Sequence, residues 1–143
     1  MSEKNKTKID RAGCLPYIIE DGEIQILFML PSKEEYGGDK FQIAKGKVED
    51  GESNKEAGIR EAQEELGLFS GNVEDTHHLG KFLGRTDFYV VKIKDKDQFG
   101  DPHFETKEVK WMTPEEFQKE GRGLHKPVVS AAVRWIKTNE GIK

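Results

Sequence analysis

The sequence predicts an α/β (α+β) domain in which helices cover both faces of a mixed β-sheet. Short apolar runs rich in β-branched residues recur along the chain, and amphipathic helical segments lie between and after them. The chain has 143 residues, about the size of one ordinary domain, and 34% of them are hydrophobic. We therefore expect residues 9–143 to form a single domain and the polar, lysine-rich residues 1–8 to form a flexible tail.

The first predicted element is a β-hairpin. Two apolar runs, 12–20 and 24–30, flank Asp21-Gly22, a dipeptide that favours the positive backbone angles of a tight turn. A polar loop over 31–40 then leads to a short strand over 41–44.

The helix predicted over 53–66 has start and stop signals at both ends. Ser53 is followed three residues later by Glu56, which is the pattern of a capping box, and Gly67 lies where a helix-ending glycine is expected. The rest of the chain alternates between the two types of element. We expect strands over 78–83, 87–93 and 108–112, a charged loop over 94–104, a short helix from Thr113-Pro114 and a last helix over 127–138.

Composition excludes several classes of function. The formal net charge of −4 argues against a general nucleic-acid binder, because such proteins carry a basic balance. The single cysteine, Cys14, cannot build a disulfide framework or a cysteine zinc site within one chain and favours a reducing compartment. No apolar run approaches the roughly 18 residues that a membrane span needs. We therefore expect a cytoplasmic protein with no membrane partner.

The helix over 53–66 has an acidic side. At about 100° per residue, Glu61, Glu64 and Glu65 project together, while the opposite side, which includes Ile59, is apolar. Like charges at this spacing destabilise a helix by a few tenths of a kcal/mol per pair, so the cluster breaks a local rule, as functional sites often do. A hard divalent cation such as Mg²⁺, which prefers carboxylate and phosphate oxygens, would convert the repulsion into binding.

Two further residues of this segment have expected structural roles. Arg60 is placed to pair with Glu52 or Glu64 and so hold these carboxylates in register. Gly58, which has no side chain, is expected to let the loop over 45–51 approach the helix closely. The competing interpretation of the three glutamates alone is an ordinary solvated helix face.

The spacing of residues over the whole segment from Gly46 to Leu68 is more specific than an acidic helix face. It reads Gly46, five residues, Glu52, seven residues, Arg60-Glu61, Ala62, one residue, Glu64-Glu65, one residue, Gly67 and Leu68. This segment resembles the Nudix box at all of its fixed positions. The resemblance implies an α/β/α sandwich with a central mixed β-sheet and the box loop and helix at its edge. In this pattern Gly46, Glu52, Arg60 and Gly67 would be structural residues.

The resemblance also implies a reaction. Nudix enzymes hydrolyse a nucleoside diphosphate linked to another moiety, by water attack on phosphorus, and use Mg²⁺ or Mn²⁺. On this chain Glu64 and Glu65 would be the principal metal ligands and Glu61 would complete the set, with Glu61 and Glu64 counted as catalytic. The backbone carbonyl of Lys45 would be a further ligand.

A carboxylate outside the box is expected to act as metal ligand or general base. Glu105 is the candidate, because it lies six residues before Trp111, like the corresponding glutamate in diadenosine polyphosphate hydrolases and RNA pyrophosphohydrolases. Glu108 is the alternative, and an exposed loop position with no role is the simpler interpretation of Glu105. The sequence leaves open whether Glu61 or Glu105 is the base.

Candidate substrate-binding residues lie on both sides of the box. The segment over 41–46 is similar to the aromatic-x-x-Pro-Lys-Gly run of diadenosine polyphosphate and diphosphoinositol hydrolases, although an alanine replaces the proline. Lys45 would place a cation beside a polyphosphate, and Arg11 and Arg85 could do likewise, the alternative being solvated surface positions. Tyr89 could stack on a base, the alternative being core packing.

The resemblance favours a dinucleoside polyphosphate or a related nucleotide as the substrate. Removal of pyrophosphate or a cap from an RNA 5′ end, and hydrolysis of ADP-ribose or of oxidised nucleotides, are the enzymatic alternatives, because the box specifies the reaction and the pocket specifies the substrate. A nucleotide-sensing module on the same fold is the alternative from another class. The sequence does not distinguish a monomer from a homodimer.

Overall fold

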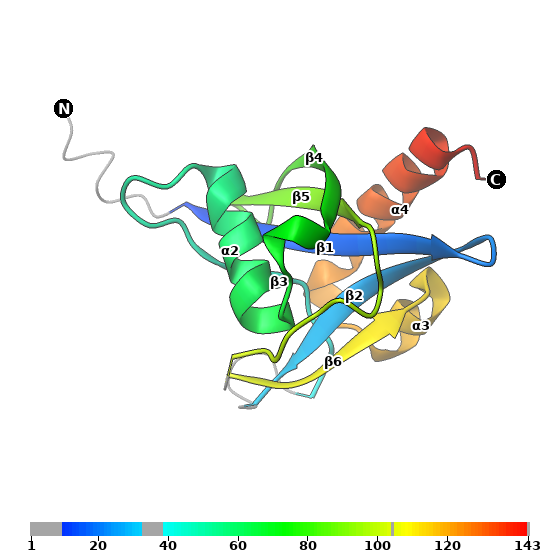
Figure 1. Ribbon diagram of the computed structural model, residues 1–143, viewed down its shortest axis with the longest axis horizontal. Helices are drawn as coiled ribbons and strands as arrows, with labels where there is room; N and C mark the ends of the chain where they lie inside the picture. The colour runs from blue at the N-terminus through cyan, green and yellow to red at the C-terminus, as the bar shows by residue number, and fades with distance from the viewer. Residues whose placement is uncertain (1–9, 33–38, 104, 143) are drawn as a thin grey trace.

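The computed structural model describes residues 10–32, 39–103 and 105–142. A six-stranded sheet with the order β4-β5-β1-β2-β6, and with β3 paired to β1, forms the central layer. Helix α2 covers one face of the sheet, and α3 and α4 cover the other (Figure 1). The predicted three-layer α/β fold is confirmed. The expected tail over 1–8 and most of the expected loop over 31–40 lie outside the described residues.

Strands β1 (Arg11–Glu20) and β2 (Glu23–Pro31) form the predicted hairpin. Asp21 and Gly22 both have positive φ, 53° and 78°, as a tight turn between antiparallel strands requires. Beyond the hairpin the two strands diverge and find different partners. The first half of β1 pairs in parallel with β5 (Thr86–Ile93), and β2 pairs with β6 (Thr106–Met112).

Two strands differ from their predicted limits by three residues or more, and β6 begins two residues earlier than expected. The strand expected over 41–44 is β3 (Ala44–Lys47), which pairs with β1, while Phe41 and Gln42 make only isolated bridges. Strand β4 (Val73–Phe82) begins five residues earlier than expected. Its first half was missed because an edge strand with polar, exposed side chains lacks the apolar alternation that marks a half-buried strand.

The helices follow their predicted signals. Helix α2 (Asn54–Leu66) begins after Ser53 and ends at Gly67, whose φ of 79° is left-handed. Helix α3 (Pro114–Glu120) begins after Thr113 with a second capping box. The 3-10 turn η3 (Gly123–His125) leads into α4 (Lys126–Glu140), and the turn η2 (Ser70–Asn72) leads from α2 into β4. Among the described residues, no helix is long and apolar enough to cross a membrane.

Two hydrophobic cores fix the layers. The larger lies between the sheet and the α3/α4 layer and includes Phe28, Phe117 and Ile136, and the smaller lies between the sheet and α2 and includes Leu66. Because successive side chains of a strand point to opposite faces, Phe88 packs in the larger core and Tyr89 in the smaller. Helix α2 is thereby held rigidly against the sheet, which is what a site built on its side chains needs.

Candidate active site

A cleft of about 600 Å³ opens where the first half of β1, β3 and α2 meet the far end of β2. Its volume lies within the range of small-molecule binding sites. Carboxylates and cations that are distant in the sequence meet there. The cleft is lined by Arg11, Met29, Pro31, Gln42, Gly46, Lys47, Glu49, Glu61, Glu65 and Glu105.

Glu61 and Glu65 form a carboxyl pair at the base of this cleft. Glu61 is only 8% exposed, and the backbone N–H of Lys45 donates to Glu65 at 3.3 Å. Burial, together with a hydrogen bond to Glu61, raises the pKa of Glu65 to about 9. A Cβ at Gly46 would overlap the Glu61 carboxylate, so only glycine lets β3 pass this close to the pair.

The acidic side of α2 is therefore not uniform. Glu61 is buried like a core residue, Glu65 is half-buried and Glu64 is exposed. Glu61 is buried because β3 crosses α2 at Gly46 and covers it, a contact that helix periodicity does not reveal. Ile59, which was expected on the packing side, is half-buried and packs against the smaller core.

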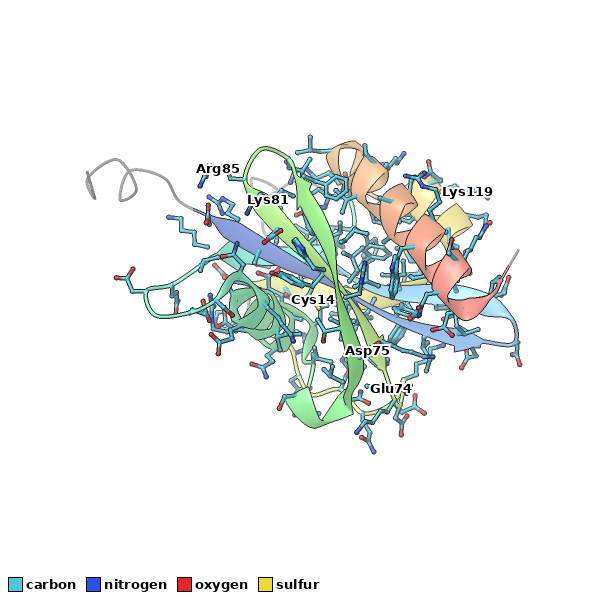
Figure 2. All side chains as sticks on the ribbon, turned by 90° about the horizontal axis from the view of Figure 1, so that it is seen from above. Cys14, Glu74, Asp75, Lys81, Arg85 and Lys119 are labelled. Carbon is cyan, nitrogen blue, oxygen red and sulfur yellow. The ribbon has the colours of Figure 1, made fainter. Side chains whose placement is uncertain are left out.

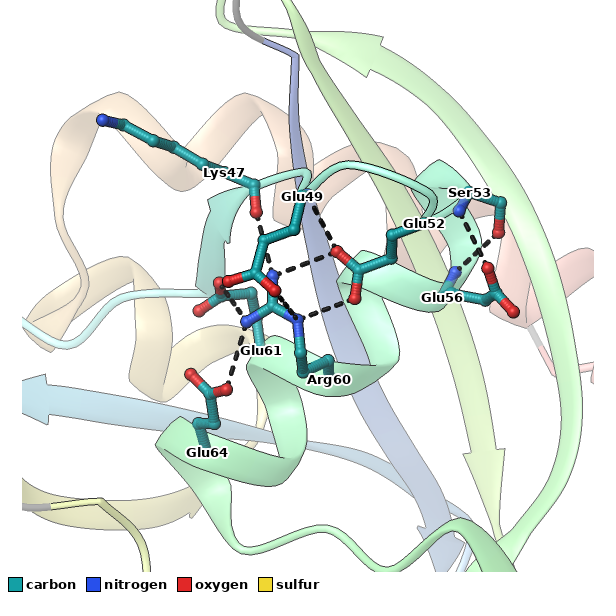
Figure 3. Close-up of polar contacts among 8 residues, drawn as sticks. All are labelled: Lys47, Glu49, Glu52, Ser53, Glu56, Arg60, Glu61 and Glu64. Carbon is teal, nitrogen blue, oxygen red and sulfur yellow. Dashed lines mark hydrogen bonds and ion pairs between the residues drawn. The ribbon is translucent and has the colours of Figure 1, made fainter.

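Arg60 connects the helix to the loop before it (Figure 3). Its Nε donates to Glu52 at 2.7 Å, its Nη2 donates to the carbonyl of Lys47 at 2.9 Å, and its Nη1 donates to both Glu61 and Glu64 at 3.1 Å. The hydrogen bond from Arg60 lowers the pKa of Glu52. One guanidinium thus fixes three carboxylates and the loop backbone relative to each other.

The start of α2 is tied to its surroundings in two ways. Ser53 and Glu56 exchange the reciprocal hydrogen bonds of a capping box, at 2.8 and 3.1 Å, which satisfy two N–H groups at the helix start. The side-chain amide of Asn54 donates to Asp87 on β5 at 3.1 Å. The first turn is thereby fixed in position on the sheet.

The predicted role of Gly58 is wrong. A Cβ there would lie 3.1 Å from the carbonyl oxygen of Gly13 and 3.3 Å from the Tyr89 ring, so the close approach is to strands β1 and β5 and not to the loop over 45–51. The projection placed Gly58 near the acidic side, but it is buried on the face that packs on the sheet. A small residue here lets the helix lie close to the strands.

The donors present fit a hard divalent cation. Glu61 and Glu65 offer carboxylate oxygens side by side, and the backbone of Lys45 lies next to them. Within the described residues, no three His, Cys, Asp or Glu side chains already enclose a metal position. Glu64 is directed toward the Arg60 guanidinium instead. Glu61 and Glu65 would therefore form half of a metal site in advance. Exposed carboxylates would complete the site by rotating their side chains.

The carboxylates expected outside the box lie in different places. Glu105 lines the cleft together with Glu61 and Glu65, and its carboxylate is 3.8 Å from Nδ1 of His103. Glu108 is exposed on β6 and does not line the cleft. Of the two, Glu105 is the residue that the fold brings to the carboxyl pair.

The expected substrate-binding residues also separate into two groups. Arg11 lines the cleft, and Lys45 is half-buried next to it, where burial and then the charges of Arg11 and Arg122 lower its pKa. Arg85 instead pairs with Asp10 at the turn between β4 and β5, outside the cleft lining (Figure 2). The substrate contact expected for Arg85 stays a prediction, and the position of this residue at the β4–β5 turn disfavours it.

Tyr89 was also expected to contact substrate, and its position favours the alternative of core packing. It is 8% exposed beneath α2, its hydroxyl donates to Asp87 at 3.4 Å, and it does not line the cleft. The alternation along β5 points this ring into the smaller core, which α2 covers.

Sequence reasoning missed several residues around the cleft. Met29 and Pro31 reach it only because β2 ends there, and Gln42 reaches it through an isolated bridge to Met29. Nearby, Nδ1 of the fully buried His125 accepts from the Ile43 N–H at 3.1 Å. Its Nε2 finds no hydrogen-bond partner among the described residues. No sequence pattern connects these positions, because the chain brings them together only through tertiary contacts.

Comparison with known proteins places the fold. The NUDIX domain profile matches residues 9–132. A crystal structure of a Caenorhabditis elegans Ap4A hydrolase binary complex is 21% identical with a TM-score of 0.71, over 94% of this chain and 99% of that one. The Nudix hydrolase RenU of Mycobacterium smegmatis is 17% identical with a TM-score of 0.67, over 94% and 87% of the two chains.

A third solved structure was determined with a ligand bound. The NUDIX domain of Shewanella oneidensis NrtR, complexed with ADP ribose, is 12% identical with a TM-score of 0.62, over 89% of this chain and 86% of that one. No curated protein matches the chain.

Proposed function

The chain belongs to the NUDIX family of hydrolases of pyrophosphate bonds, and we propose that its cleft cleaves a nucleoside diphosphate linked to another moiety. The observation that carries this proposal is the meeting of two kinds of group in one cleft. The carboxyl pair Glu61 and Glu65 lies at its base, and Glu105 and the cation Arg11 lie on its walls. Carboxylates suit a divalent cation, and the cation of the wall suits phosphate.

The cofactor in this proposal is Mg²⁺, with Mn²⁺ as a substitute. Glu61, Glu64 and Glu65 would hold it, with the carbonyl of Lys45 and with Glu105. When bound, the ion supplies charge neutralisation at the pyrophosphate and lowers the pKa of the attacking water.

Separate side chains have the roles of general base and of positioning the carboxylates. Glu61 already accepts from Arg60 and shares a hydrogen bond with Glu65, whereas Glu105 is exposed at the cleft, with Nδ1 of His103 at 3.8 Å from its carboxylate. We therefore assign proton removal from the water to Glu105 and positioning of the carboxylates to Arg60. A base must reach its proton within hydrogen-bond distance, and an exposed side chain can rotate to do so.

A dinucleoside polyphosphate such as diadenosine tetraphosphate is the favoured substrate. The cleft has cations beyond the carboxyl pair, as a chain of several phosphates requires, and one similar structure is that of an Ap4A hydrolase. ADP-ribose is the second candidate, because another similar structure is complexed with it.

A nucleotide panel tests the proposal. Product release is measured with Mg²⁺ for wild type and Glu64→Gln on diadenosine tetraphosphate, ADP-ribose, FAD, 8-oxo-dGTP and triphosphorylated RNA. We expect turnover of diadenosine tetraphosphate by wild type and a loss of at least about 100-fold in Glu64→Gln, since metal ligation supplies several kcal/mol. A wild type that binds nucleotide without cleaving any would show a sensing module instead. Undiminished activity in Glu64→Gln would refute the ligand assignment.

A further inference from the structure

Arg122 lies in the connection between α3 and α4, where the backbone holds it beside a segment that contributes to the cleft, although Arg122 itself is not one of the cleft-lining residues. The N–H of Phe41 donates to the carbonyl of Glu120 at 3.1 Å, and the N–H of Arg122 donates to the carbonyl of Phe41 at 2.9 Å. These bonds form a parallel bridge between Phe41 and Gly121. The connection therefore runs alongside the segment that enters the box.

The direction of the Arg122 side chain follows from this pairing. A Cβ at Gly121 would point into the ring of Phe117, which is in the larger core. Both Gly121 and Arg122 have extended backbone angles, so their side chains alternate and Arg122 points away from that core. Gln42, which follows Phe41 in the same way, lines the cleft. Arg122 therefore leaves the bridge on the same side as Gln42.

Arg11 and Lys45 meet at the same place from another direction. Gly13 pairs with Lys45 in the β1–β3 ladder, and Arg11 lies two residues before Gly13, so the side chains of Arg11 and Lys45 leave the same face of the sheet. Lys45 is close enough to both arginines for their charges to lower its pKa, after the larger effect of burial. Arg11, Lys45 and Arg122 together are called the cationic wall below.

The charges of Glu65 and Glu61 partly oppose the cationic wall, because they raise the pKa of Lys45 against the larger effects that lower it. Among the described residues, no carboxylate forms an ion pair with any of its three members, whereas Arg60 and Arg85 are both paired. Three cations held together in a chain of net charge −4 are locally unfavourable, which indicates a place for an anion. Two guanidinium groups favour a tetrahedral oxyanion, because each can donate two parallel hydrogen bonds to phosphate.

Lys45 connects the cationic wall to the carboxyl pair. The backbone N–H of Lys45 donates to Glu65, while its side chain belongs to the wall. The two regions are therefore adjacent, as consecutive phosphates of one chain would require.

We propose that Arg122, with Arg11 and Lys45, forms a subsite for a phosphate group beyond the two phosphates that flank the cleaved bond. Arg122 thereby selects substrates with a chain of three or more phosphates over nucleoside diphosphate derivatives. This inference rests on the proposed function for its catalytic consequence, but the binding site itself does not.

Binding of inorganic tripolyphosphate to the metal-free protein tests the subsite without any catalysis. Isothermal titration should give about a tenfold higher Kd for Arg122→Gln than for wild type, which corresponds to the loss of one charge-assisted contact of about 1.4 kcal/mol. Arg122→Lys should recover part of the loss. The matched control is Arg134→Gln, an exposed arginine on α4 outside the cleft, with less than about a twofold change. Equal affinity in Arg122→Gln, or no binding to wild type, overturns the proposal.

Steady-state kinetics on two substrates distinguish a failure of this inference from a failure of the proposed function. In Arg122→Gln, kcat/KM for diadenosine tetraphosphate should fall about tenfold, mainly through KM, while that for ADP-ribose changes less than about twofold. An equal fall for both substrates overturns the selectivity. If wild type cleaves neither, the proposed function fails, and the tripolyphosphate titration still decides the subsite. Thermal unfolding of each variant shows that the fold is retained.

Discussion

The two walls of the cleft differ in how their charges are satisfied. On the α2 side, Arg60 donates to three carboxylates and to a backbone carbonyl, and Glu61 and Glu65 share a hydrogen bond. On the opposite side, the described residues offer Arg11 and Arg122 no carboxylate partner. The α2 side is thus organised before any ligand arrives, whereas the cationic wall leaves its charges for a substrate. The difference suggests that the first wall sets the reaction and the second selects what is cleaved.

Gly46→Ala should break the α2 side most strongly. The new Cβ would displace the Glu61 carboxylate, the flexible end of a side chain, so the fold should survive while the carboxyl pair moves. We expect kcat to fall about 100-fold, as misplacement by about 1 Å can cause, with a small change in Tm. Gly71→Ala is the control, because a Cβ there meets nothing within 4 Å. Unchanged kcat in Gly46→Ala would show that Glu61 need not keep this position.

Arg60→Gln should loosen the same wall. It removes the donor shared by Glu52, Glu61 and Glu64, and we expect the free energy of unfolding to fall by about 1–2 kcal/mol, because these groups are only partly shielded from solvent. Turnover should fall about tenfold through poorer positioning. Urea unfolding and steady-state kinetics measure both effects. Full turnover with reduced stability would restrict Arg60 to folding.

His125 lies near the cationic wall and should make stability depend on pH. Burial, followed by the charges of Lys45 and Arg122, lowers the pKa of His125 from 6.5 to about 3. Between these two pH values, the imidazole is protonated in the unfolded chain but not in the folded chain. The contribution of neutral His125 to the free energy of unfolding is complete above about pH 6.5 and is lost as the pH falls toward 3.

Urea unfolding between pH 7 and 4 measures this loss against His125→Asn, whose side-chain oxygen can replace the acceptor Nδ1. Relative to the variant, wild type should lose up to about 1.4 kcal/mol per pH unit below pH 6. Parallel curves for the two proteins would contradict the buried, neutral state of His125.

Arg85→Gln should have the smallest effect. Arg85 and Asp10 form a partly exposed pair away from the cleft, and such pairs contribute about 0–1 kcal/mol. We expect kcat/KM to change less than about twofold and Tm to change little. A selective loss of activity on diadenosine tetraphosphate would return Arg85 to the substrate-binding set.

The two walls of the cleft also differ in how much of each could be predicted from the sequence. The α2 wall comes from one continuous segment, Gly46 to Leu68, so residue spacing alone indicated its carboxylates, its caps and Arg60. The burial of Glu61 was not predictable, because it depends on β3 crossing the helix at Gly46. Periodicity reports which side of a helix a residue occupies, and not which element covers that side.

The opposite wall comes from separate segments, and it was predicted poorly. Arg122 carries no motif, and the bridge between Gly121 and Phe41 brings it beside Gln42, which lines the cleft. Arg85 looked equivalent to Arg11 because both border a strand, but only Arg11 lines the cleft. Long-range pairing decides such positions, and a single sequence does not display it.

The dependence of turnover on Mg²⁺ tests most directly whether the α2 wall is a metal-binding catalytic site. Protein freed of metal by chelation is titrated with Mg²⁺, and product release from diadenosine tetraphosphate, or from the best substrate of the panel, is followed for wild type and Glu65→Gln. We predict no turnover without the ion, saturable activation of wild type, and a requirement for at least about tenfold more Mg²⁺ in Glu65→Gln. Full turnover in the presence of chelator, or the same Mg²⁺ curve for both proteins, would contradict the assignment.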